Sequence, residues 1–204
     1  MAGFLGTTVQ LLVLLNPFAV LATFLALAGS ANTKVKKQII RRCTAAIILS
    51  GTMLLFCGNI IFQVLGINID LFKAGGGIIL MISAVTMVCG RESGGKNNDK
   101  THPENDLGIA VVPLAIPMAV GPGTAAGLII IGIESMNSPG EMALATAALA
   151  VATAAIGLLL HSSVQVLKFF GKGGISVITK LTGLFLSAIA AKLILEGIQN
   201  TLKL

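Results

Sequence analysis

Six long apolar segments run along the chain, and short polar stretches separate them. A helix that crosses a membrane needs about 20 consecutive, mostly apolar residues. Runs such as AAIILSGTMLLF at 45–56 do not alternate as the strands of a membrane β-barrel do. The pattern therefore predicts an all-α membrane protein with six transmembrane helices. We expect these helices over residues 4–28, 41–65, 71–90, 107–133, 141–168 and 176–199.

The composition agrees with a membrane setting. Apolar residues make up 55% of the chain and charged residues 11%, whereas soluble domains carry roughly 25% charged residues. The net charge of +6 does not indicate nucleic-acid binding, because the basic residues lie in the gaps between apolar runs and form no continuous face. The three cysteines form no CxxC pair, so we expect packing residues and no metal site.

Basic residues are unevenly spread over the loops, and this sets the expected orientation. The second loop has only Lys73 at its edge, and the fourth has Glu134 and Glu141 but no basic residue. Lysine and arginine favour the cytoplasmic side of a membrane. We therefore expect the odd loops to be cytoplasmic and both termini to face outward. The basic residues of the odd loop regions are Lys34, Lys36, Lys37, Arg41, Arg42, Arg91, Lys96, Lys100, Lys168 and Lys172.

A polar stretch at 91–106 divides the chain into two halves of three spans, 1–90 and 107–204. We interpret this stretch as a flexible cytoplasmic linker. Three is an odd number, so the halves must be inverted relative to each other, which is a recurrent plan among transporters. One shift of 107 residues aligns the third span with the sixth. It pairs, among others, Lys73 with Lys180, Gly76 with Gly183 and Gly90 with Gly197.

The first and fourth spans each contain a helix break near the centre. Asn16-Pro17 interrupts the first span, and the fourth contains Pro117 and then Gly121-Pro122-Gly123. Proline lacks an N–H and clashes with the preceding turn, whereas Asn before Pro is typical of a helix start. The spacing therefore predicts a new half-helix from each break, at mid-membrane.

The start of each half-helix offers unpaired N–H groups and the positive end of a dipole, which together suit a carboxylate. Carbonyls left free by proline would suit a substrate ammonium or a coupling ion. The alternative is a pair of plain proline kinks that serve helix packing. The candidate substrate-binding residues are Val13, Asn16, Pro17, Phe18, Pro113, Pro117, Gly121, Pro122, Gly123 and Thr124.

Other polar groups indicate structural roles rather than catalysis. His161-Ser162-Ser163 lacks the nucleophile turn of a serine protease, so we expect interhelical hydrogen bonds and no enzyme. Lys192 and Glu196 lie one helical turn apart, and both a functional role and a surface ion pair remain open. The GxxxG motif at 123–127 favours close helix contact and leaves an oligomer open.

Several motifs together resemble the MarC family of bacterial inner-membrane proteins, also described as a neutral amino acid transporter family. They are Asn16-Pro17, KAGGGIIL at 73–80, VVPLAIP at 111–117, Gly121-Pro122-Gly123 and LEGI at 195–198. The resemblance covers nearly the whole chain. It implies two inverted three-helix repeats with helices 1 and 4 broken, a location in the bacterial inner membrane, and glycine or alanine as the substrate class. In that membrane, the outward-facing termini expected from the basic residues are periplasmic.

We therefore expect a secondary transporter of small neutral amino acids that works by alternating access. The breaks fit the substrate carboxylate, and the spans offer no deep charge for a charged side chain. We expect no cofactor, with coupling to Na⁺ or H⁺ left open. The expected partners are the substrate and membrane lipid, without nucleic acid, and an oligomer stays open. The alternatives are an exporter of peptides or other metabolites, and a membrane scaffold or assembly factor without transport.

Overall fold

The computed structural model describes residues 3–29, 31–66, 68–89, 107–136 and 138–202. The expected linker at 91–106 lies outside these ranges. Within them the chain is helical and contains no strand. The helices are α1 (Phe4–Leu15), α2 (Pro17–Ala28), α3 (Thr33–Leu65), α4 (Ile69–Val88), the 3₁₀ helix η1 (Leu107–Ala110), the irregular helix η2 (Val111–Ala119), α5 (Pro122–Ser135), α6 (Pro139–His161) and α7 (Ser163–Leu202). η2 is interrupted by extended backbone at Val112 and Ile116, each directly before a proline.

Five segments of the described chain are long and apolar enough to cross a membrane, which confirms an all-α membrane protein. The expected fourth span differs, because it consists of η1, η2 and α5, and its apolar helix covers only Gly123–Ser135. The five long segments are Phe4–Ala28, Thr33–Gly58, Ile69–Val88, Pro139–His161 and Gly173–Leu202.

The second helix begins eight residues before the expected start at residue 41, so that boundary was wrong. Asn32 caps the start of α3, because its Oδ1 accepts a hydrogen bond from the Val35 amide at 2.9 Å. Lys36 Nζ donates to the Gly29 carbonyl at 2.8 Å and ties α3 to the end of α2. The basic stretch that we expected to be a loop is therefore the first part of a helix.

The fifth span ends at His161 rather than at residue 168. α7 begins directly after Ser162 and contains a turn at Gly171, where φ is 63° and ψ is 176°. Glycine adopts this positive φ without steric strain. Residues 163–170 therefore form a separate short helical segment before the last span, although the sequence pattern placed most of them in the fifth span.

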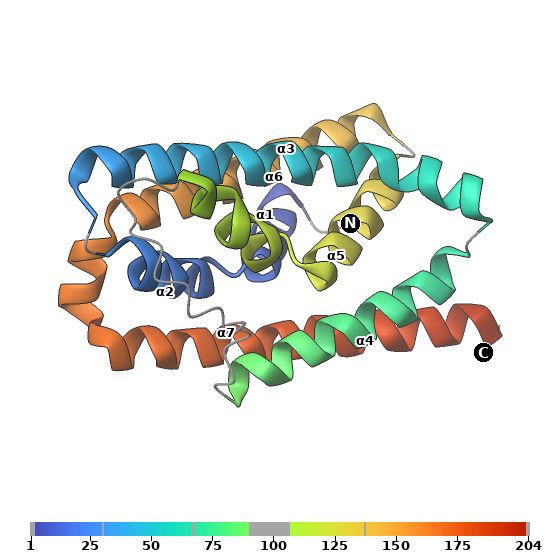
Figure 1. The fold of residues 1–204 in the computed structure, drawn as a ribbon. Helices are drawn as coiled ribbons and strands as arrows, with labels where there is room; N and C mark the ends of the chain where they lie inside the picture. The colour runs from blue at the N-terminus through green and yellow to red at the C-terminus, as the bar shows by residue number, and fades with distance from the viewer. Residues whose placement is uncertain (1–2, 30, 67, 90–106, 137, 203–204) are drawn as a thin grey trace.

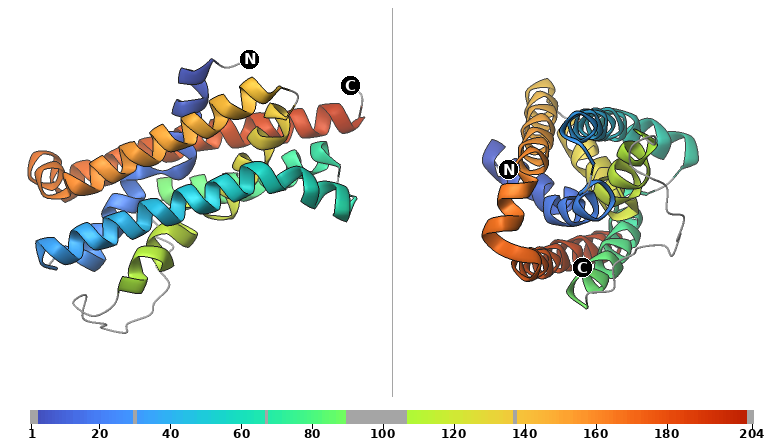
Figure 2. Two further views of the ribbon diagram at one scale, coloured as in Figure 1. Left: turned by 90° about the horizontal axis from the view of Figure 1, so that it is seen from above. Right: turned by 60° about the vertical axis from the view of Figure 1, so that its left-hand side comes forward.

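The helices form three layers (Figure 1). α3 and α6 run along one side, and α4 and α7 run along the other. The broken helices α1, α2, η2 and α5 lie between them, and the end-on view in Figure 2 agrees. Leu11, Leu15, Leu21 and Phe24 are fully buried, as expected for this middle layer. Both helix breaks are therefore in the interior of the protein.

Glycines let the helices approach closely. α4 and α7 are antiparallel, because Gly197 lies against Asp70 at the start of α4 and Gly183 lies against Val88 at its end. A Cβ built on Gly197 would be 2.4 Å from the Asp70 carbonyl oxygen. α5 approaches α3 closely at Gly132, where a Cβ would be 2.2 Å from the Leu55 carbonyl oxygen.

Gly132→Ala should destabilise the protein, because the new methyl group would overlap the backbone of α3. Overpacking of this kind typically costs about 1–3 kcal/mol. Gly75→Ala is the matched control, because no atom lies within 4 Å of its Cβ position. Thermal unfolding in detergent should show a lower Tm for the first variant and an unchanged or higher Tm for the second. Equal Tm values would contradict the packing of α5 on α3.

Candidate functional site

The first break is a single residue between two helices. α1 ends at Leu15 and α2 begins at Pro17, which places Asn16 alone in the left-handed region with φ 48° and ψ 68°. Asparagine tolerates this conformation better than most residues do. The Asn16 amide donates to the carbonyls of Leu12 and Val13 at 3.2 and 3.3 Å. The Val13 carbonyl, which we expected proline to leave free, therefore has a partner.

The Asn16 side chain is buried and points into the break. Only 7% of the residue is exposed. Its Oδ1 caps α2 by accepting from the Ala19 amide at 3.3 Å, as the sequence predicts. Its Nδ2 donates to the Met87 sulfur at 3.2 Å. A thioether is a weak acceptor, so this buried amide would gain from a stronger one, such as a carboxylate.

The second break separates η2 from α5. η2 ends at Ala119, Gly121 is extended, and Pro122 opens α5. Gly121 supplies no side-chain cap, so the first-turn amides at Gly123 and Thr124 have neither an intrahelical acceptor nor a capping side chain. No ionisable residue occurs in α1, α2, η1 or η2. The partial charges of the half-helix ends therefore dominate the local electrostatics.

The two breaks lie against each other. The Thr124 hydroxyl in the first turn of α5 donates to the Leu14 carbonyl in the last turn of α1 at 2.8 Å, and this bond is buried. One turn later, Gly127 packs against the Leu14 side chain. The structure thus brings together two of the predicted regions, Asn16-Pro17 and Gly121–Thr124, although they are more than 100 residues apart in the sequence.

α4 covers both breaks, which the sequence did not predict. Leu80 packs against Gly123, where a Cβ would lie 2.8 Å from the leucine side chain. Met87 contacts Asn16, as described above. The space beside Gly123, which we expected to hold substrate, is therefore occupied by Leu80. Access to the breaks requires α4 and α5 to separate or Leu80 to move.

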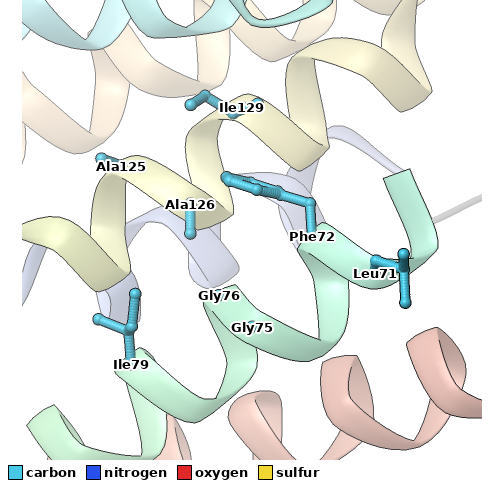
Figure 3. A pocket seen from close by; sticks show the side chains of 8 residues that line it. All are labelled: Leu71, Phe72, Gly75, Gly76, Ile79, Ala125, Ala126 and Ile129. Carbon is cyan, nitrogen blue, oxygen red and sulfur yellow. The ribbon is translucent and has the colours of Figure 1, made fainter. Parts of the chain in front are cut away.

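A cavity of about 410 Å³ lies along the same seam between α4 and α5 (Figure 3). Phe72, Gly76 and Ile79 line it from α4, and Ala125, Ala126 and Ile129 line it from α5. Its walls are almost entirely apolar. The volume is within the usual range for small-molecule pockets, but none of the lining residues has a polar side chain to orient a ligand. It indicates loose packing where α5 would need to move.

One ion pair joins α4 to α5 beside this seam. Lys73 Nζ lies 2.5 Å from Glu134 Oε1. The lysine side chain is 11% exposed and the glutamate side chain 54% exposed. The ammonium is therefore largely removed from solvent, and the carboxylate is its only ion-pair partner among the described residues. The sequence analysis placed both residues at the edges of loops and did not predict that they pair, because the pairing depends on how α4 packs on α5.

Several known proteins are similar in sequence to this chain over most of its length. The profile of the MarC family of integral membrane proteins matches residues 1–202. The chain belongs to the MarC family. The membrane protein YhcE of Escherichia coli is 31% identical over 198 residues, which cover 94% of this chain and 90% of YhcE. The inner membrane protein MarC of Salmonella arizonae is 27% identical over 207 residues, covering 96% of this chain and 93% of that one.

A further relative, a membrane protein of Aquifex aeolicus, is 27% identical over 203 residues, covering 98% of this chain and 94% of the relative. No solved structure matches the chain. The family resemblance noted from the motifs is therefore confirmed. The names of these MarC-family relatives state a membrane location and specify no substrate.

The remaining predicted residues divide into two groups. Pro17 and Phe18 are partly buried at the first break. The side chains of Pro113, Pro117 and Pro122 lie outside the description, and only their helices, η2 and α5, can be compared with the prediction. In the described part of this MarC-family protein, no three His, Cys, Asp or Glu side chains lie close enough to hold a metal ion.

The other polar candidates lie away from the breaks. Lys192 and Glu196 form an ion pair of 3.6 Å on an exposed surface of α7. His161 is exposed at the end of α6, whereas Ser163 is buried at the start of α7. None of these side chains approaches Asn16 or Thr124 through a hydrogen bond within the described chain.

Glu134→Gln should destabilise the protein more than Lys73→Met. The first leaves a buried ammonium unpaired, and breaking a buried pair costs up to about 3–5 kcal/mol, so we expect about 2 kcal/mol for this half-exposed one. The second removes the buried charge and keeps an apolar stem of similar length. The double variant should recover much of the loss in Tm. Strictly additive losses in the double variant would show that the two groups do not interact.

Proposed function

We propose that this MarC-family protein is a secondary transporter of small neutral amino acids, of the glycine or alanine type, across the bacterial inner membrane. One observation carries the proposal, namely the buried contact between two helix breaks that both present half-helix starts. Such paired breaks in the interior of a membrane protein are typical of transporter binding sites. Irregular backbone at this depth is otherwise costly unless it lines a site.

Charge explains why a neutral amino acid fits best. The substrate carboxylate would accept hydrogen bonds from the Asn16 amide group and from first-turn amides of α2 and α5, near the positive ends of both helices. No ionised side chain is available in α1, α2 or η2 to pair with a charged substrate side chain. A small side chain suits a site bounded by Leu80 and Met87.

Transport by alternating access would use two inverted halves, and the packing of α4 on α7 supports this arrangement. A Cβ on Gly77 would lie 2.9 Å from the Ala190 carbonyl oxygen, and one on Gly183 would lie 3.1 Å from the Ala84 carbonyl oxygen. Gly183 follows Gly77 by 106 residues, and Ala190 follows Ala84 by the same number. Equivalent residues thus exchange contacts, as a two-fold axis between the halves requires.

The packing of α3 on α6 supports the same relation. Gly51 packs against the Leu149 side chain, and Gly157 packs against the Thr44 methyl group. Gly157 follows Gly51 by 106 residues, and the equivalent of Leu149 is residue 43, next to Thr44. The contacts in both outer layers support a pseudo-two-fold relation, within one residue of the 107-residue shift that the sequence suggests.

The direct test is counterflow of labelled glycine or alanine into liposomes that contain the purified protein. A transporter of this class should accumulate label against a preloaded pool, with Na⁺ and H⁺ gradients varied to find the coupling ion. Counterflow of peptides or other metabolites alone would favour an exporter. No counterflow of any substrate would favour a scaffold or assembly role.

The expected orientation of the protein in the membrane gives a testable prediction. Inverted three-helix halves place residue 98 and the C-terminus on opposite sides, with both termini periplasmic according to the basic residues of the odd loops. Alkaline phosphatase should be active when fused after residue 204, and green fluorescent protein should fluoresce when inserted at residue 98. Both positions on one side of the membrane would refute the inverted halves.

The proposed substrate site gives a further prediction. Asn16→Ala should weaken substrate affinity roughly tenfold or more, since a lost cap and a lost bond to a charged ligand together exceed about 1.4 kcal/mol. Ser162→Ala, at the distant α6–α7 junction, is the control and should leave affinity unchanged. The carboxamide analogue of the substrate should bind poorly, because its amide group carries no negative charge for the helix ends. Equal binding of acid and amide would show that the breaks are structural kinks.

A further inference from the structure

Charged side chains are unevenly distributed between the two ends of the molecule. The described acidic residues lie at one end, at the start of α4, the end of α5, the start of α6 and the end of α7 (Figures 1 and 2). The start of α3 and the α6–α7 junction lie at the other end. The acidic residues in question are Asp70, Glu134, Glu141 and Glu196.

The opposite end carries a row of cations on α3. Lys34, Lys37 and Arg41 are three and four residues apart, so they lie on one face of the helix. Arg42 is adjacent to this row. All four side chains are exposed, and none has an ion-pair partner among the described residues. Lys36 differs, because it is partly buried and its ammonium binds the Gly29 carbonyl.

The same side of α3 changes character further along the helix. Leu49, Met53 and Ile60 follow Arg42 by 7, 11 and 18 residues, so they lie on the face of Arg42, beside the cation row. They are 75%, 65% and 61% exposed. The opposite face is buried in the core throughout, through Ile39, Cys43 and Ile47, which are fully buried. The outward side of α3 therefore begins with exposed cations and continues, below Arg42, as an exposed apolar stripe.

This order matches the cross-section of a bilayer leaflet. The apolar stripe suits acyl chains, and the cation row, about two to four helical turns before it, is at the depth of the lipid headgroups. Four unpaired cations next to a spanning helix are typical of anionic lipid recognition. A soluble acidic partner would not need the continuous apolar stripe below the row.

We propose that Lys34, Lys37, Arg41 and Arg42 form a binding site for the phosphate headgroups of anionic phospholipids such as phosphatidylglycerol. This site is separate from the helix breaks and does not depend on the transported substrate. It would fix the depth and tilt of α3, whose inner face packs on α5 and α6. The lipid would thereby act on the packing that surrounds the breaks.

The test uses the full-length protein in phosphatidylcholine nanodiscs that contain a small fraction of spin-labelled phosphatidylglycerol or spin-labelled phosphatidylcholine. The wild-type protein should immobilise phosphatidylglycerol in preference to phosphatidylcholine, and the preference should weaken as salt is raised. In the triple variant Lys34→Gln, Lys37→Gln, Arg41→Gln, the preference should be lost. Thermal unfolding in pure phosphatidylcholine should be unchanged, which separates lost binding from lost folding.

A matched control removes three cations from the C-terminal half of the chain, through Lys180→Gln, Lys192→Gln and Lys203→Gln. It changes the net charge by the same amount and should keep the preference for phosphatidylglycerol. The proposal is overturned if the control loses as much preference as the α3 variant, since net charge alone then explains binding. It is equally overturned if the wild-type protein shows no preference, and the cation row then suits a soluble acidic partner.

Discussion

One buried hydrogen bond, from the Thr124 hydroxyl to the Leu14 carbonyl, joins the two halves of the chain where their helices are broken. Each helix break exposes backbone groups that a membrane interior cannot solvate. The bond satisfies one carbonyl at the end of α1 with a hydroxyl from the start of α5. It also places two half-helix starts next to each other, so that their dipoles act on one region.

Two pairs of long helices surround this central contact. α3 with α6 and α4 with α7 enclose the broken helices, and glycines at Gly51, Gly77, Gly157 and Gly183 allow each pair to approach closely. α4 has a double role, because it packs on α7 and also covers both breaks through Leu80 and Met87. A movement of α4 relative to α5 would therefore open the breaks, and the cavity along that seam leaves room for it.

Much of the arrangement could be predicted from local chemistry. Proline removes a backbone donor wherever it occurs, so the breaks at Pro17 and Pro122 follow from the sequence alone. The start of α3 at Thr33 was missed, because a search for apolar runs does not detect a polar helix capped by Asn32. The pairing of Lys73 with Glu134 could not be predicted, since it depends on how α4 and α5 pack.

The central claim is that a substrate carboxylate binds where the two breaks meet. Solid-state NMR of the reconstituted protein, with ¹³C-carboxyl glycine or alanine and ¹⁵N at the amides of Phe18 and Thr124, tests it most directly. A carboxylate hydrogen-bonded to these amides places its carbon within about 4 Å of the nitrogen, so strong dipolar dephasing is expected. A bound ligand that shows no dephasing from either amide would contradict the account.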